Sequence, residues 1–304
     1  MQERYQNLRI AEKGVILSML AYIFLAALKV IVGQLADSAT LIADGANNIT
    51  DILSSLAIIY GLRLARRPPD EHHQYGHWKA ETIATFATSL VMLATGGSVI
   101  YSSIKQMLTG QENTPGIYSL FVGIISAIIM LWIYFHNARL AKKIKSASLL
   151  AIAKDTRNDA WTSIGTSLTI IAANFKLPQI DNLVAMLIGG LILKTAYHIL
   201  SDSAFALSDG FDDDLLDQYI AAVEKIPQVE KVHNIQGRTY GANIYVDIII
   251  WVDPQMTVRE SHHVTEKVES LLRRKFTVYD TDVHVEPWDV DYEPLQPNEL
   301  NSGY

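Results

Sequence analysis

Long apolar runs fill the first two thirds of the chain, and the pattern changes after about residue 200. A helix that spans a membrane needs roughly 20 mostly apolar residues. Six runs meet that requirement, at about 14–34, 39–62, 82–105, 116–136, 148–174 and 182–200. Charges of both signs precede the first run, and no small-residue cleavage site follows it. We therefore expect a retained first helix rather than a signal peptide.

The last third has the pattern of a small α+β domain. Residues 212–226 predict a helix, because they begin with acidic residues and carry apolar residues at helical spacing. Residues 257–276 predict a second helix, which begins with a Thr cap. Residues 229–241 and 242–253 predict a strand pair, and 280–287 predict a last strand. In the second strand Ile244, Val246, Ile248 and Ile250 share one face, and Asp247 lies on the other. The order α-β-β-α-β predicts a split sheet with both helices on one side.

Lys and Arg are concentrated in alternate loops between the apolar runs. Arg4, Arg9 and Lys13 precede the first run. Arg63, Arg66 and Arg67 follow the second run, and Arg139, Lys142, Lys143 and Lys145 follow the fourth. Cytoplasmic loops carry this excess in membrane proteins. We therefore expect both termini, and everything after the sixth run, to be cytoplasmic.

Composition narrows the chemistry. The net charge of −7 argues against a nucleic-acid partner. The chain has no cysteine, which excludes disulfides and thiolate metal ligands.

Polar residues interrupt the second and fifth apolar runs. The stretch "ADGANNITDI" brings Asp44, Asn47, Asn48 and Asp51 into the second run, and "DTRNDAW" brings Asp155 and Asp159 into the fifth. Carboxylates four residues apart share a helix face and repel each other unless a cation or a proton lies between them. Ionisable residues inside a span mark an ion or proton path by default, although such groups can also only hydrogen-bond neighbouring helices. Spacing alone leaves two pairs open in the second run, Asp44 with Asn48 and Asn47 with Asp51.

Four motifs together make the chain recognisable. They are "DSATLIADGANNITDILSS", "PPDEHHQYGHWKAE", "DTRNDAWTS" and "HVEP". With them the chain resembles the cation diffusion facilitator family over nearly its whole length. The resemblance implies a polytopic α-helical membrane protein with six transmembrane helices and a C-terminal α+β ferredoxin-like cytoplasmic domain. We expect a transport domain at 1–207, the cytoplasmic domain at 208–290, a flexible tail at 291–304 and a homodimer that exchanges divalent metal for protons.

The resemblance also implies a transport site. Its pattern places the metal ligands on Asn47, Asp51, Asp155 and Asp159. Zinc-transporting members typically have a histidine in this set, so the chain resembles the bacterial manganese-exporting branch. An all-oxygen site suits a hard cation such as Mn²⁺, whereas imidazole favours Zn²⁺. Fe²⁺ is the neighbour of Mn²⁺ in the affinity series, and Mg²⁺ dehydrates too reluctantly for a compact site.

Two further metal sites are implied. One lies in the loop after the second run, on Asp70, His73 and His77. The other lies in the cytoplasmic domain, on His233, Asp247, His262, His284 and Glu286. His284 and Glu286 alternate along a strand and so share one face. Each of these residues also has a plainer interpretation as a solvated surface group.

The sequence thus predicts a proton-coupled exporter of Mn²⁺ in the plasma membrane of a bacterium, without a catalytic cofactor. A Fe²⁺ or Zn²⁺ exporter of the same family is the first alternative. A membrane-embedded metal-dependent hydrolase is a remote one, because it would need a nucleophile or base aimed at a substrate, and no such motif is present. A metal sensor without transport would not explain the acids in two spans.

Overall fold

A computed structural model describes residues 2–35, 39–109, 117–173 and 179–288. Contacts divide the chain into two compact units, Met1–Ser208 and Asp209–Tyr304. The predicted flexible tail at 291–304 lies outside the described residues.

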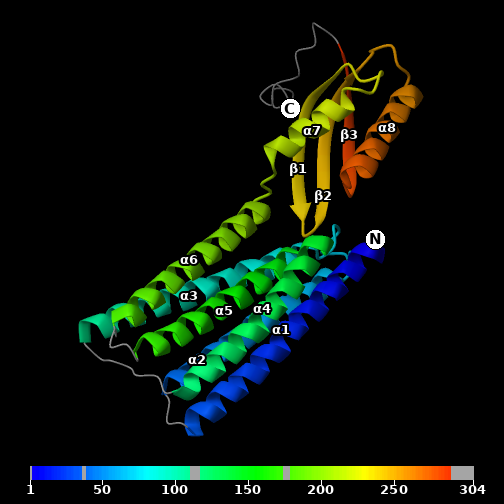
Figure 1. Ribbon diagram of the computed structural model, residues 1–304. Coiled ribbons are helices and arrows are strands. Elements are labelled where there is room, and N and C mark those ends of the chain that lie inside the picture. Colours follow the sequence, from blue (N-terminus) through cyan, green and yellow to red (C-terminus); the bar gives the residue numbers. More distant parts are fainter. Residues whose placement is uncertain (1, 36–38, 110–116, 174–178, 289–304) are drawn as a thin grey trace, which may run out of the picture. The chain divides into compact units, whose positions relative to one another are not determined.

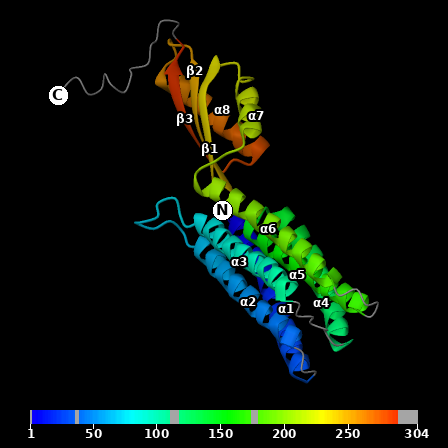
Figure 2. The same cartoon turned by 90° about the vertical axis from the view of Figure 1, so that its left-hand side faces the viewer.

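The first unit is a bundle of long helices (Figures 1 and 2). Within the described residues it has α1 (Gln2–Leu35), α2 (Ala39–Ala65), α3 (Lys79–Thr109), α4 (Ile117–Ile144), α5 (Ala147–Ala173) and α6 (Gln179–Leu207). Within the described residues each predicted run is helical, and most of the helices extend beyond their apolar run. By length and composition, Arg4–Leu35, Lys79–Thr109 and Leu120–Ile144 are apolar enough to cross a membrane among the described residues. The helices α2 and α5 carry the aspartates in their interiors.

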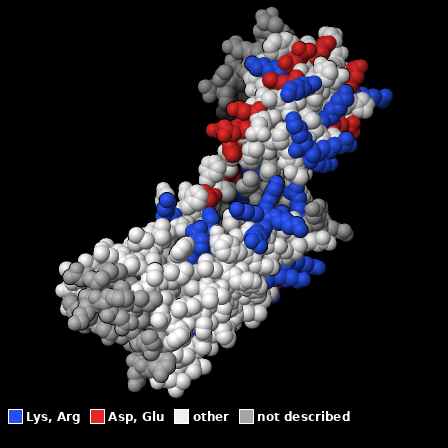
Figure 3. All heavy atoms as spheres, in the orientation of Figure 1, with Lys and Arg blue, Asp and Glu red and all other residues white. Residues whose placement is uncertain are grey.

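The outer surface of the bundle is apolar. Large exposed side chains include Leu20, Phe24, Leu53, Phe121, Ile128 and Trp132. A soluble protein rarely exposes so much apolar surface, whereas lipid covers it without cost. Figure 3 shows Lys and Arg gathered at one end of this unit, where α2 and α4 end with Arg63, Lys142 and Lys143. The unit therefore has the surface of a membrane domain with one basic end.

The turn between α4 and α5 is held by a buried acid on α3. Lys145 has a positive φ of 54°, and Ser146 caps α5 by accepting a hydrogen bond from the Leu149 N–H at 3.3 Å. The carboxylate of Glu81, only 3% exposed, accepts hydrogen bonds from the hydroxyls of Ser146 at 2.6 Å and Ser148 at 2.8 Å. An anion is stabilised at a helix N-terminus. Glu81 therefore fixes the start of α5 against the first turn of α3.

The second unit is the predicted α+β domain. It comprises α7 (Asp213–Val223), β1 (Lys231–Tyr240), β2 (Asn243–Val252), α8 (Val258–Phe276) and β3 (Asp280–Pro287). The sheet order is β1-β2-β3, with β1 antiparallel and β3 parallel to β2. Both helices lie on one face of the sheet in Figures 1 and 2. The order α-β-β-α-β is confirmed.

The core of this unit lies between the sheet and the two helices. Tyr219 and Val223 of α7 and Val268 of α8 pack against the buried Ile248 and Ile250 of β2. The predicted isoleucine face of β2 is thus the core face. The helix α8 begins with a capping box, in which the Thr257 side chain and the Glu260 side chain each accept the other residue's backbone N–H.

Candidate metal centre

Three carboxylates meet inside the helical unit. Asp51 comes from α2, and Asp155 and Asp159 come from α5, one turn apart. Their ligand oxygens lie within 4.8 Å of one another, which is close enough to share one cation. Asp51 and Asp155 are buried, and Asp159 is partly buried. We call Asp51, Asp155 and Asp159 the carboxylate triad.

Two buried oxygens at the triad lack a hydrogen-bond partner. One is Oδ2 of Asp159, and the other is Oδ1 of Asn48. The Asn48 amide donates to Oδ2 of Asp51 at 3.3 Å, and its side chain is 1% exposed. A buried polar atom without a partner is costly unless a ligand satisfies it. The chemistry of these oxygens fits a hard divalent cation.

Asn47 and Asp51 are four residues apart on α2 and therefore on the same helix face. Asn47 is partly buried. The structure brings Asp51 to the aspartates of α5. The role of Asn47 as the fourth ligand stays a prediction.

The triad is backed by apolar packing from α1 and α4. Tyr22 and Leu25 of α1 form a fully buried cluster with Met130 of α4 and Ala160 of α5. The Tyr22 hydroxyl shares a hydrogen bond of 3.0 Å with the Thr156 hydroxyl, next to Asp155. This wall excludes water from one side of the carboxylates, so their mutual repulsion is weakly screened.

Asp44, the other aspartate of α2, has a partner of its own. Its Oδ2 lies 2.8 Å from Nζ of Lys29 on α1, and Lys29 is only 2% exposed. Sequence reasoning missed Lys29, although a lone lysine in an apolar run is itself a functional signal. The ion pair shows that Asp44 lies against α1.

The loop residues Asp70, His73 and His77 form a second cluster. Their ligand atoms also lie within 4.8 Å of one another. Oδ1 of Asp70 accepts the backbone N–H groups of His72 at 3.0 Å and His73 at 2.8 Å, which folds the loop back on itself. Oδ2 of Asp70 lies 3.4 Å from Nε2 of His77. Slight desolvation raises the pKa of Asp70, but the hydrogen bonds from His73 and His72 outweigh it and hold that pKa below its usual range.

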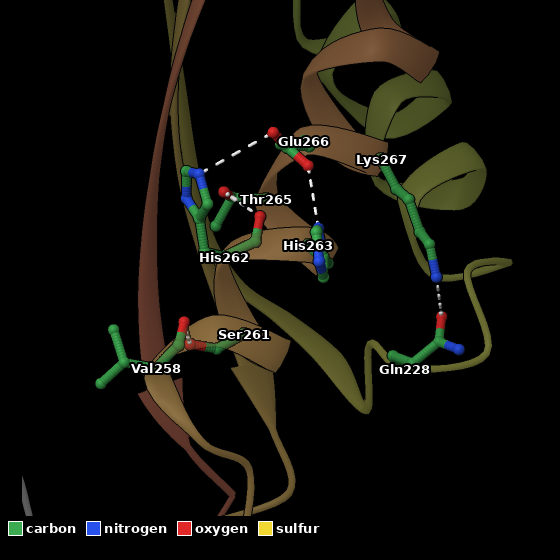
Figure 4. A network of polar contacts seen from close by, with 8 residues as sticks. All are labelled: Gln228, Val258, Ser261, His262, His263, Thr265, Glu266 and Lys267. Carbon is green, nitrogen blue, oxygen red and sulfur yellow. Dashed lines mark hydrogen bonds and ion pairs between the residues drawn. The ribbon is translucent and has the colours of Figure 1, made fainter.

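The five residues predicted to bind metal in the cytoplasmic domain are divided among separate contacts. Asp247 pairs with Arg238, which donates to both carboxylate oxygens. Nε2 of His262 lies 3.8 Å from Oε1 of Glu266, whose other oxygen lies 3.0 Å from His263 (Figure 4). One protomer therefore does not gather Asp247 and His262 with the other three within the described residues.

The remaining three residues lie around Trp251. His233 stacks on the Trp251 ring at 4.5 Å between ring centroids, and the indole N–H donates to Glu286 at 3.0 Å. Nε2 of His284 lies 3.7 Å from Oε1 of Glu286. The predicted common face of His284 and Glu286 is confirmed. Metal binding at this face stays a prediction.

Comparisons with known proteins agree with the division into two units. Residues 15–208 match the model of the cation efflux transmembrane domain, and residues 211–288 match the cytoplasmic domain of cation efflux proteins, ZT_dimer. The chain is 40% identical to the manganese efflux system protein MneS of Bacillus subtilis over 94% of this chain and 98% of that protein. It is 26% identical to the manganese efflux system protein MneP of the same organism over 92% and 97%. The solved structure "MamM CTD - Copper form" is 25% identical, covers 29% of this chain and 94% of that chain, and has a TM-score of 0.25.

Proposed function

Because this chain belongs to the cation efflux family, whose transmembrane and cytoplasmic models it matches over 15–208 and 211–288, we propose that it exports Mn²⁺ from the cytoplasm in exchange for protons. The observation that carries the proposal is the carboxylate triad. Two helices far apart in the sequence contribute acids to one point inside an apolar bundle. Such a site binds a cation that passes through the membrane.

The ligand chemistry supports Mn²⁺ as the cargo. Carboxylate and amide oxygens suit hard cations, and the triad consists of three aspartates, whereas a histidine or cysteine ligand would favour Zn²⁺. A site without imidazole does not bind Mn²⁺ more tightly than Zn²⁺, but it lacks the ligand that most favours Zn²⁺ over Mn²⁺. Both relatives named above are manganese efflux proteins. Fe²⁺ remains the alternative with the most similar chemistry.

The crowding of the triad supports proton exchange. Three carboxylates in contact with an apolar wall repel one another strongly when no cation is present. Release of the metal therefore favours uptake of protons by the same oxygens, and arrival of the next metal ion expels them. The two kinds of cation compete for one site, which is the requirement for exchange.

The basic end of the helical unit supports a cytoplasmic location for that end. Positive residues near the ends of spans are retained in the cytoplasm. Since α1 begins and α6 ends at this end of the bundle, both termini are then cytoplasmic. We place the protein in the plasma membrane as a homodimer, a state to which the name of the matched family ZT_dimer refers.

A flux assay tests the proposal. The full-length protein is reconstituted in liposomes with an acidic lumen, and entry of Mn²⁺, Fe²⁺ and Zn²⁺ is measured with a metal-sensitive dye while a second dye reports luminal pH. We expect Mn²⁺ entry to alkalinise the lumen and to stop when the pH gradient is dissipated. Metal entry that is indifferent to the gradient would refute proton exchange, and a larger flux of Zn²⁺ would refute the choice of metal.

The cytoplasmic residues support a regulatory role in the dimer. Because one protomer divides the five ligands among separate contacts, a metal held by all of them requires a rearrangement or a second subunit. We expect Mn²⁺ to shorten and narrow the distances between spin labels on the two cytoplasmic domains of the full-length dimer. Double electron–electron resonance measures this, with a His284→Ala variant as the matched control. Identical distance distributions with Mn²⁺ and with a chelator would remove the regulatory role.

A further inference from the structure

An ion pair with a buried lysine and a partly exposed aspartate lies near the carboxylate triad, and metal binding by the triad does not by itself require it. Lys29 of α1 and Asp44 of α2 are joined at 2.8 Å, and the Lys29 side chain is 2% exposed. Asp44 precedes Asp51 by seven residues, which is roughly 10 Å along a helix. The pair is therefore close enough for its charges to act on a cation bound by the triad.

The packing of α1 on α2 leaves the lysine little freedom to move away. A Cβ atom on Gly45 would lie 2.8 Å from a methyl of Val30 and 3.3 Å from Cβ of Lys29. The absence of a side chain at position 45 lets the two helices approach at this point. The Lys29 stem is thereby enclosed, and its ammonium is directed at Asp44.

The ammonium of Lys29 also acts electrostatically on the triad. At a separation of roughly 10 Å inside a weakly polar bundle, the charges of Lys29 and Asp44 are poorly screened from the triad. The pair and the triad thus interact electrostatically within the helical unit. An uncompensated positive charge in it would oppose a divalent cation, and an uncompensated negative charge would hold the cation more tightly.

We propose that Lys29 is a tethered counter-cation, which Asp44 restrains, and that the pair sets how tightly the carboxylate triad holds its divalent metal. The inference rests on the proposed function only in that the triad must bind such a metal. With the N-terminus in the cytoplasm, the pair lies between the triad and the outer face. Lys29 is then a positioning residue on the outer side of the triad rather than a ligand.

The proposal predicts opposite effects for the two halves of the pair. Lys29→Met leaves Asp44 uncompensated, so metal affinity should rise about tenfold and turnover should fall because release is slow. Asp44→Asn leaves Lys29 uncompensated, so affinity should fall about tenfold. The double variant has lost both charges and should bind within about threefold of wild type. A pair that only joins two helices would give effects of the same sign.

The experiment titrates Mn²⁺, Fe²⁺ and Zn²⁺ into the full-length dimer in nanodiscs by calorimetry. The binding component that disappears in Asp51→Asn is assigned to the triad, and flux of each metal is measured in parallel. Lys29→Arg keeps the charge and should retain wild-type affinity and turnover. Opposite shifts that the double variant cancels support the proposal, whereas equal shifts or no shift overturn it.

A second variant covers the case in which a single variant fails to fold. The reversal Lys29→Glu with Asp44→Lys keeps the ion pair but anchors the ammonium on α2, the helix that carries Asp51. Both charges remain and compensate each other, so we expect metal affinity within about threefold of wild type, and a tenfold change would overturn the proposal. Failure of the proposed function shows differently, because wild type itself would then bind or transport none of the three metals.

Discussion

Replacing Asp159 or Asp51 by asparagine is expected to reduce metal flux at least about 100-fold while the dimer stays intact. Each substitution removes one of three negative charges that face the cation in an apolar interior, at nearly unchanged side-chain volume. A loss of about 2.8 kcal/mol in binding already corresponds to 100-fold, and charges buried together in a protein interact by at least that much. Flux in proteoliposomes measures the effect, and size-exclusion chromatography checks the dimer.

Asp202→Asn on α6 is the matched control for this prediction. Its carboxylate is 63% exposed and lies 3.6 Å from Nε2 of His198. The same chemical change there should leave flux within about twofold of wild type, as for most exposed ion pairs. Near-normal flux in Asp51→Asn or Asp159→Asn would remove the triad from the transport path and return attention to Asp44.

Asn47→His is expected to shift the relative affinity of the proposed transport site from Mn²⁺ toward Zn²⁺. With Asn47 as the predicted fourth ligand, the substitution puts an imidazole beside three carboxylates. Imidazole raises affinity for Zn²⁺ more than for Mn²⁺, because Zn²⁺ stands higher in the affinity order and accepts four ligands readily. A differential of about 1.4 kcal/mol shifts the Zn²⁺ to Mn²⁺ ratio tenfold. Binding and flux must both be measured, since a tighter site releases Zn²⁺ more slowly.

Asn48→His separates the two amides of α2. Asn48 is the buried one and donates to Asp51, so a histidine there should disturb the orientation of that carboxylate and lower transport of both metals. Asn47→His alone should change their ratio. If instead the ratio changes only in Asn48→His, the fourth ligand is Asn48, and the assignment by resemblance was wrong at this position.

Much of the fold follows from patterns that the sequence displays locally. Apolar runs of spanning length became the six helices, and alternation in β2 placed Ile248 and Ile250 in the core. The pairing of Asp155 with Asp159 follows from their spacing on one helix. These features depend on the chain's own periodicity, so a single sequence predicts them.

Contacts between elements depend on helix rotation and strand register, which the sequence does not display. Lys29 has a partner only because α1 presents it to Asp44. Asp247 meets Arg238 because Arg238 lies opposite Tyr245, which places it diagonally across the β1–β2 pair from Asp247. Asp247 could be predicted from the sequence as a candidate metal ligand, whereas its ion pair with Arg238 could not.

The hydrogen bonds that Glu81 accepts from Ser146 and Ser148 join the first turn of α3 to the start of α5. The loop cluster ends at His77, two residues before α3 begins at Lys79, and Asp155 lies about two turns into α5. If α5 tilts to open the carboxylate triad, the start of α3 has to move with it. Otherwise the buried Glu81 carboxylate loses its hydrogen-bond donors, at a cost of about 1–3 kcal/mol. A movement of α5 at the triad is therefore coupled, through the hydrogen bonds of Glu81, to the start of α3 and the loop cluster that precedes it.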